Sequence, residues 1–93
     1  MEIVLQFNKA DTRLAGNSYG RKVFEDQVRD KIQYNQKNII IFPNNIEKVA
    51  SSFVQGFFAE IVKMIGYEKF DDVIEIHAKS EELARRIKSD LIA

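Results

Sequence analysis

The spacing of hydrophobic residues changes along the chain and predicts the order of its elements. Residues 2–7 alternate between polar and apolar side chains, which is typical of a strand with one buried face. In residues 19–34 the apolar side chains recur at helical spacing, so we expect an amphipathic helix there. Residues 37–42 end in an unbroken apolar run, a pattern that favours a central strand covered on both faces. The first half of the chain therefore predicts strand, helix and strand.

The second half repeats this alternation of element types. Residues 53–65 predict the most buried helix, which ends at Gly66, a residue type often found just after a helix. The apolar stripes of this helix are Phe53, Phe57, Ile61 and Met64, and Val54, Phe58, Val62 and Ile65. Its narrow outer face holds Gln55, Gly56, Ala59, Glu60 and Lys63. Residues 73–78 predict a third strand, and Ser80 predicts the cap of a final helix with acids in its first turn.

The resulting order, β-α-β-α-β-α, predicts a single α/β domain over residues 1–93. Each strand–helix–strand crossover is long enough to join parallel neighbours. We therefore expect a small, mainly parallel or mixed sheet covered by helices. Residues 37–42 are the predicted central strand, because so apolar a run would be insoluble at an exposed edge.

The amino-acid composition excludes several kinds of functional site. The chain has no cysteine and a single histidine, His77, which excludes disulfides, thiolate catalysis and Cys- or His-rich metal sites. The 14 basic residues balance 14 acidic ones, without the basic excess that is typical of nucleic-acid-binding proteins. No apolar run approaches the roughly 20 residues of a membrane-spanning helix. We expect a cytoplasmic protein that binds neither nucleic acid nor a membrane.

The most informative polar segment joins the predicted central strand to the most buried helix. It ends in Ser51 and Ser52, two hydroxyls at a helix N-terminus, where free backbone N–H groups favour oxygen atoms and negative charge. Ser52 and Gln55 fit a capping box with Ser52 at the N-cap. Such a cap explains Ser52 without any function, whereas Ser51 is not needed by the cap and is the more informative serine.

Several short motifs match one known family. They are Ile39, Ile40 and Ile41 in the strand, Ile46 and Val49 in the loop, Ser51, Ser52 and Phe53 at the helix start, and residues 12–16 with Arg21 upstream. In this pattern the chain resembles the STAS-like family, small domains related to sulfate-transporter and anti-sigma-factor-antagonist domains. Phe42 and Pro43 stand where the family pattern has an acidic and an aromatic residue. The resemblance therefore supports a binding surface more strongly than a phosphorylation switch.

The resemblance implies a non-enzymatic regulatory module of bacterial or phage origin, monomeric or weakly dimeric. Its partner would be a protein, such as a histidine-kinase-type ATPase or another regulator. Any ATP would be held by that partner, so the module itself carries no cofactor, and Ser51 or Ser52 would be the site of any phosphorylation. The implied contact surface is the loop of residues 44–48 and the first turn of the following helix: Asn44, Asn45, Glu47, Lys48, Ser51, Ser52, Gln55 and Gly56.

Two other hypotheses remain open at this point. Ligands in α/β proteins bind in the crevice beyond the carboxyl ends of parallel strands, so a small-molecule-binding or enzymatic domain is the main alternative. A concave pocket lined by Arg13, Asn44, Asn45 and Ser51 would favour that alternative over a protein-binding surface. The third hypothesis is a structural homo-oligomer that forms through the edge strand, residues 2–7.

Overall fold

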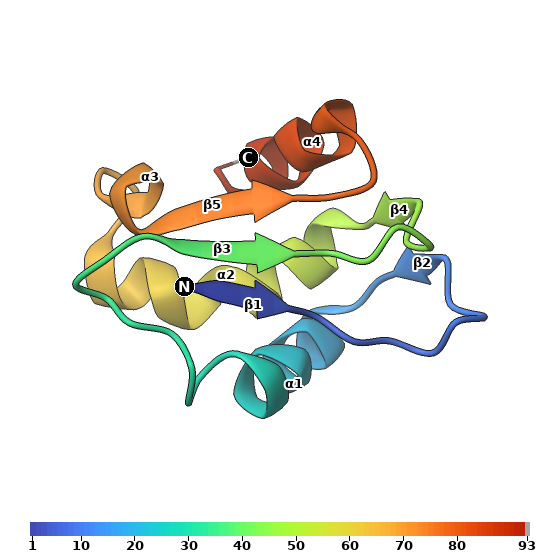
Figure 1. Ribbon diagram of the computed structural model, residues 1–93, viewed down its shortest axis with the longest axis horizontal. Coiled ribbons are helices and arrows are strands. Elements are labelled where there is room, and N and C mark those ends of the chain that lie inside the picture. The colour runs from blue at the N-terminus through green and yellow to red at the C-terminus, as the bar shows by residue number, and fades with distance from the viewer. Residues whose placement is uncertain (93) are drawn as a thin grey trace.

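A three-stranded parallel sheet lies at the centre of the protein. The computed structural model describes residues 1–92 (Figure 1). The strands of this sheet are β1 (Glu2–Val4), β3 (Asn38–Ile41) and β5 (Ile74–His77), in the order β1-β3-β5. Ile40 of β3 pairs with Ile3 on one side and with Ile76 on the other. The prediction of an α/β fold whose central strand lies within residues 37–42 is confirmed.

Residues 1–92 also form four helices and a second, smaller sheet. The helices are α1 (Asn17–Gln27), α2 (Ser51–Ile65), the single-turn α3 (Phe70–Val73) and α4 (Glu81–Leu91). α2 packs against both α1 and α4, and it lies behind the main sheet in Figure 1. The smaller sheet pairs β2 (Arg13–Leu14) with β4 (Lys48–Val49), in parallel, beyond the carboxyl ends of the main strands.

α2 supplies the centre of the core, as its apolar stripes predict. Phe57 and Ile61 are both fully buried, with 0% of their surface exposed. The ring of Phe57 lies 6.0 Å from that of Phe24 in α1 and 6.0 Å from that of Phe42, which follows β3. Met64 corrects the predicted stripe, because it lies in the last turn of α2 and is 63% exposed.

The backbones of α1 and α2 touch where the two helices cross. A Cβ atom on Gly20 would lie 2.3 Å from the carbonyl oxygen of Phe53, and one on Gly56 would lie 2.1 Å from that of Asn17. Real Cβ atoms do not approach a backbone oxygen so closely, so both positions require glycine. Gly56 is therefore buried in this seam, which corrects the expectation that it lies on the exposed face of α2.

The first helix is shorter than its spacing predicts. α1 ends at Gln27 rather than near Tyr34, because two successive backbone N–H groups donate to the same carbonyl and the chain then turns. Arg29 in this turn forms an ion pair with Glu60 of α2 at 2.7 Å, and the hydrogen bond raises the pKa of Arg29. Asn38 is fully buried, and its amide donates to carbonyls of the turn and of the residue before β5. These bonds hold the connection between α1 and β3 in place.

Helices cover one face of the main sheet and leave the other open. Ile3 and Ile40 point toward the helices and are buried, whereas Val4 is 51% exposed and Ile39 and Ile41 are half-buried. The expected cover on both faces of the central strand is therefore wrong. Both crossover helices lie on one side, as expected when a sheet grows in one direction through crossovers of the same hand.

Candidate functional site

The starts of α1 and α2 lie side by side and are joined by a hydrogen bond. The backbone N–H of Gly16, the N-cap of α1, donates to Oγ of Ser52 at 3.0 Å. Ala50 is the N-cap of α2, because its N–H extends the β2–β4 pairing by donating to the carbonyl of Leu14, and the helix begins directly afterwards. The predicted capping box of Ser52 and Gln55 is therefore wrong. Ser52 instead ties the two helix starts together.

No side chain caps the first turn of either of these two helices. α1 and α2 both lack a side-chain cap and have no acidic residue in the first turn. α4 differs, because Oγ of Ser80 accepts from the N–H of Leu83 at 3.1 Å and Glu81 and Glu82 lie in its first turn. A helix N-terminus carries about half a positive charge, so the adjoining starts of α1 and α2 favour negative charge. Ser51, the first residue of α2, is exposed at this place.

The loop of residues 44–48 combines structural and exposed residues. Asn45 is half-buried, and its Nδ2 donates at 2.8 Å to a backbone carbonyl of the segment before β2. Asn44, Glu47 and Lys48 are exposed. Asn45 therefore holds the shape of the loop, and the other three side chains are accessible to a partner.

The first turn of α2 places its predicted contact residues in different surroundings. Ser51, Ser52 and Gln55 are exposed, whereas Gly56 is buried against α1. Gly56 therefore sets how closely α1 and α2 approach and has no surface of its own for a partner. The loop of residues 44–48 and the first turn of α2 both lie at the end of the molecule beyond the carboxyl ends of the main strands (Figure 1).

A cleft of about 490 Å³, which we call the strand-end cleft, opens beside the β2–β4 pair and the first turns of α4. Its charged lining consists of Arg13, Glu47, Lys48 and Arg86. Of the four residues expected to line a pocket here, Arg13 alone does so. The role of Arg86 was not predicted, because residues 13, 48 and 86 come from three segments that no local sequence pattern connects.

Other chemistry is sparse in the part of the chain that the structure describes. Within residues 1–92, no group of three or more His, Asp or Glu side chains is placed to hold a metal ion. No helix among these residues has the length and apolar character needed to cross a membrane. The imidazole of His77 lies 2.5 Å from the carboxylate of Glu75, both on β5. No known family model, curated protein or solved structure matches this chain.

Proposed function

We propose that this chain is a non-enzymatic, STAS-like regulatory module of the cytoplasm that binds a protein partner beside the joined starts of α1 and α2. The contact area, which we call the helix-start surface, consists of the exposed residues Asn44, Glu47, Lys48, Ser51, Ser52 and Gln55. The observation that carries the proposal is the pair of adjoining helix N-termini without caps or acids. The partner is a histidine-kinase-type ATPase or another regulator, and it would hold any nucleotide itself.

Charge is the basis of recognition in this proposal. The two helix dipoles point their positive ends at the same place, and the exposed Lys48 adds a full positive charge beside them. An acidic patch on the partner would be attracted there. Phosphorylation of Ser51 would add about −1.5 to −2 charges. The free N–H groups of α2 would accommodate that phosphate, so the modification would act on partner binding and leave the fold intact.

The test compares two double variants that make the same chemical changes. One combines Ser51→Asp with Gln55→Arg on the helix-start surface. The control combines Ser89→Asp in the last turn of α4 with Gln36→Arg in the turn before β3, both exposed positions away from that surface. The partner is captured from the native host with the wild-type chain and identified by mass spectrometry. Its affinity for each purified variant is then measured by calorimetry.

We expect the first double variant to bind the partner at least about tenfold more weakly, which corresponds to about 1.4 kcal/mol. The control should bind as the wild type does. Ser51→Asp alone should leave the melting temperature unchanged or slightly higher, because an acid suits a helix N-terminus. Equal affinities of the two double variants would show that the helix starts serve the fold alone.

The strand-end cleft favours a second function, the binding of a small anionic ligand. Arg13, Lys48 and Arg86 surround it with three cationic groups against one acid, Glu47. Calorimetric titration with inorganic phosphate and phosphorylated metabolites would test this function. Arg86→Ala should weaken binding, whereas Arg85→Ala, on the neighbouring residue outside the cleft, should not. The loss of ligand binding with partner binding intact would separate the two functions.

A further inference from the structure

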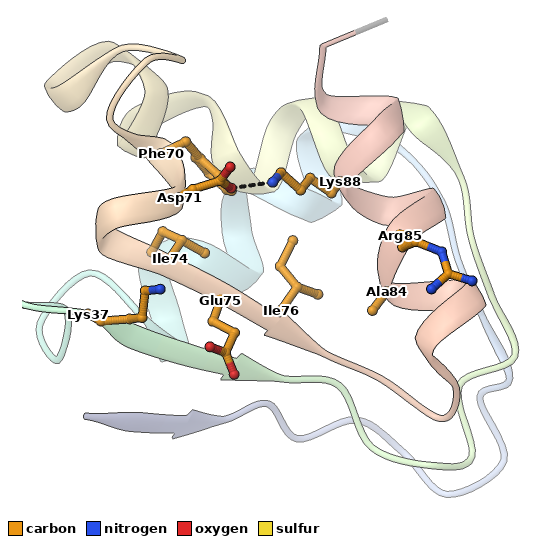
Figure 2. A pocket seen from close by; sticks show the side chains of 9 residues that line it. All are labelled: Lys37, Phe70, Asp71, Ile74, Glu75, Ile76, Ala84, Arg85 and Lys88. Carbon is orange, nitrogen blue, oxygen red and sulfur yellow. Dashed lines mark ion pairs between the residues drawn. The ribbon is translucent and has the colours of Figure 1, made fainter.

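The outer edge of β5 borders a groove of about 270 Å³ (Figure 2). Ile74 and Ile76 of β5 line one side of this groove, and Ala84 and Arg85 of α4 line the other. At one end an ion pair between Asp71 and Lys88 joins α3 to α4. The groove is therefore a strand edge on one side and a helix on the other. We call it the β5 groove.

Backbone groups of β5 point into this groove. The carbonyl of His77 accepts from the N–H of Phe42 at 2.8 Å, so the backbone groups of His77 face β3. Successive residues of a strand in a parallel sheet direct their backbone groups to opposite sides. Those of Ile74 and Ile76 must then face the outer edge. The N–H of Ile74 bonds to the carbonyl of Phe70. Within residues 1–92, the carbonyl of Ile74 and both backbone groups of Ile76 have no partner.

The charged side chains that line the β5 groove indicate which kind of peptide could pair with this strand edge. Of the two acids that line it, Asp71 pairs with Lys88, and Glu75 contacts His77, which carries charge only when protonated. Arg85 has only Glu81 at 3.8 Å, and both side chains are largely exposed. Lys37 also lines the groove, and no acid among residues 1–92 pairs with it. The lining therefore holds three basic side chains, Lys37, Arg85 and Lys88, against two acids, and its net charge is positive.

We propose that an extended, acidic peptide segment of a partner protein binds in the β5 groove and adds a fourth strand to the main sheet. Its main chain would satisfy the outward groups of β5, and main-chain pairing of this kind is an established mode of peptide recognition. A carboxylate of the peptide would pair with Arg85, and an apolar side chain would lie over Ile76 and Ala84. A second copy of this chain suits the groove less well, because it would bring a second Arg85 against the first.

This inference does not depend on the helix-start surface. Arg85 and Arg86 are neighbours on α4, but Arg85 lines the β5 groove and Arg86 lines the strand-end cleft. Each lies 3.8 Å from a glutamate one turn earlier, Glu81 and Glu82 respectively. The two arginines are therefore a matched pair for mutation. They lie on the same helix and form the same kind of ion pair, but they line different cavities.

The test selects random peptides displayed on phage against the immobilised full chain. The best binder is then synthesised with a fluorescent label, and its affinity is measured by polarisation for the wild type, Arg85→Glu and Arg86→Glu. We expect acidic peptides with alternating apolar residues. Arg85→Glu should weaken their binding about tenfold or more, and Arg86→Glu should leave it within about twofold. Replacing the acidic residue of the peptide by lysine should restore binding to Arg85→Glu.

Two further measurements locate the peptide. Bound peptide should protect the backbone N–H of Ile76 from hydrogen exchange, and Ala84→Tyr, which fills the groove without a change of charge, should abolish binding. The proposal would be overturned if no selected peptide bound in solution, or if Arg85→Glu and Arg86→Glu had equal effects. It would also be overturned by a dimer in light scattering that Ala84→Tyr dissociates, because the edge would then belong to a second copy.

Discussion

The two edges of the main sheet differ in how a flanking helix meets them. Beyond β1, the side chain of Gln27 in α1 binds both backbone groups of Gln6. The N–H of Gln6 donates to Oε1 of Gln27 at 2.7 Å, and Nε2 of Gln27 donates to the carbonyl of Gln6 at 2.9 Å. These are the bonds that another strand would form. Within residues 1–92, the outward backbone groups of Glu2 and Val4 in β1 and of Ile76 in β5 have no such partner.

The difference follows from how closely the flanking helices are held. The seam of Gly20 and Gly56 brings α1 against the backbone of α2, and from there Gln27 reaches the end of the β1 edge. α4 buries Leu83 and Ile87 in the core and leaves Arg85 exposed beside β5. An open strand edge is a liability for aggregation. The bonds of Gln27 shorten the open stretch along the β1 side, and the charged helix α4 lies beside the open edge of β5.

The largest effect is expected from removing a core side chain that contacts both α1 and the residue after β3. Phe57 is fully buried and contacts aromatic rings of α1 and of the residue after β3. We expect Phe57→Ala to lower the free energy of unfolding by about 3–5 kcal/mol, a large share of the total for a domain of this size. Urea denaturation followed by circular dichroism measures it. Met64→Ala in the same helix is the control, and a similar loss in both variants would show that Phe57 does not lie at the centre of the core.

A larger side chain in the seam between α1 and α2 should destabilise the fold far more than one in the β5 groove. Gly56→Val places a side chain against the backbone of Asn17, which cannot rotate away as a side chain would, so we expect a loss of about 3 kcal/mol. Ala84→Val in the β5 groove should cost less than about 1 kcal/mol, close to its effect on helix propensity. The same denaturation experiment compares them. Equal losses would mean that α1 and α4 are held with equal tightness.

The sequence predicted the parts of the fold that depend on local periodicity. The buried positions Phe57 and Ile61 and the central position of residues 37–42 are confirmed. The length of α1 was overestimated, because residues 28–34 keep apolar spacing while the chain turns to meet Asn38. A buried asparagine that holds such a turn leaves no periodic signal.

The sequence predicted the local position of the two serines and not the contacts that they form. The serines were expected at a helix start and are found there, but Ser52 bonds to Gly16, distant in sequence. Gly56 was expected outside because the two apolar stripes of the helix leave it on the narrow outer face, and it is inside because the other helix approaches it. Long-range contacts of this kind, like the position of Arg86 in the strand-end cleft, cannot be inferred from local spacing.

A smaller effect is expected from removing the side chain that bonds to Gln6 beyond β1. Gln27→Ala removes both bonds to Gln6, which at about 0.5–1 kcal/mol for each solvent-exposed hydrogen bond should lower stability by about 1–2 kcal/mol. It also frees the backbone of Gln6 for another strand. We expect light scattering to show association at high concentration that the wild type lacks. Gln55→Ala, a change at an exposed glutamine of α2, should alter neither quantity.

The smallest expected effect comes from comparing the N-terminus of α4, which lies beside β5, with the N-terminus of α2, at the centre of the core. Ser80 caps α4 through the N–H of Leu83, so Ser80→Ala should lower the free energy of unfolding by about 1 kcal/mol. Ser51 lies at the start of α2 without forming a cap, and Ser51→Ala should change stability by less than about 0.5 kcal/mol. Urea denaturation of the two variants in parallel measures the difference. If Ser51→Ala proved the more destabilising, Ser51 would be a structural residue of α2, and its exposed hydroxyl would no longer support a role in partner binding.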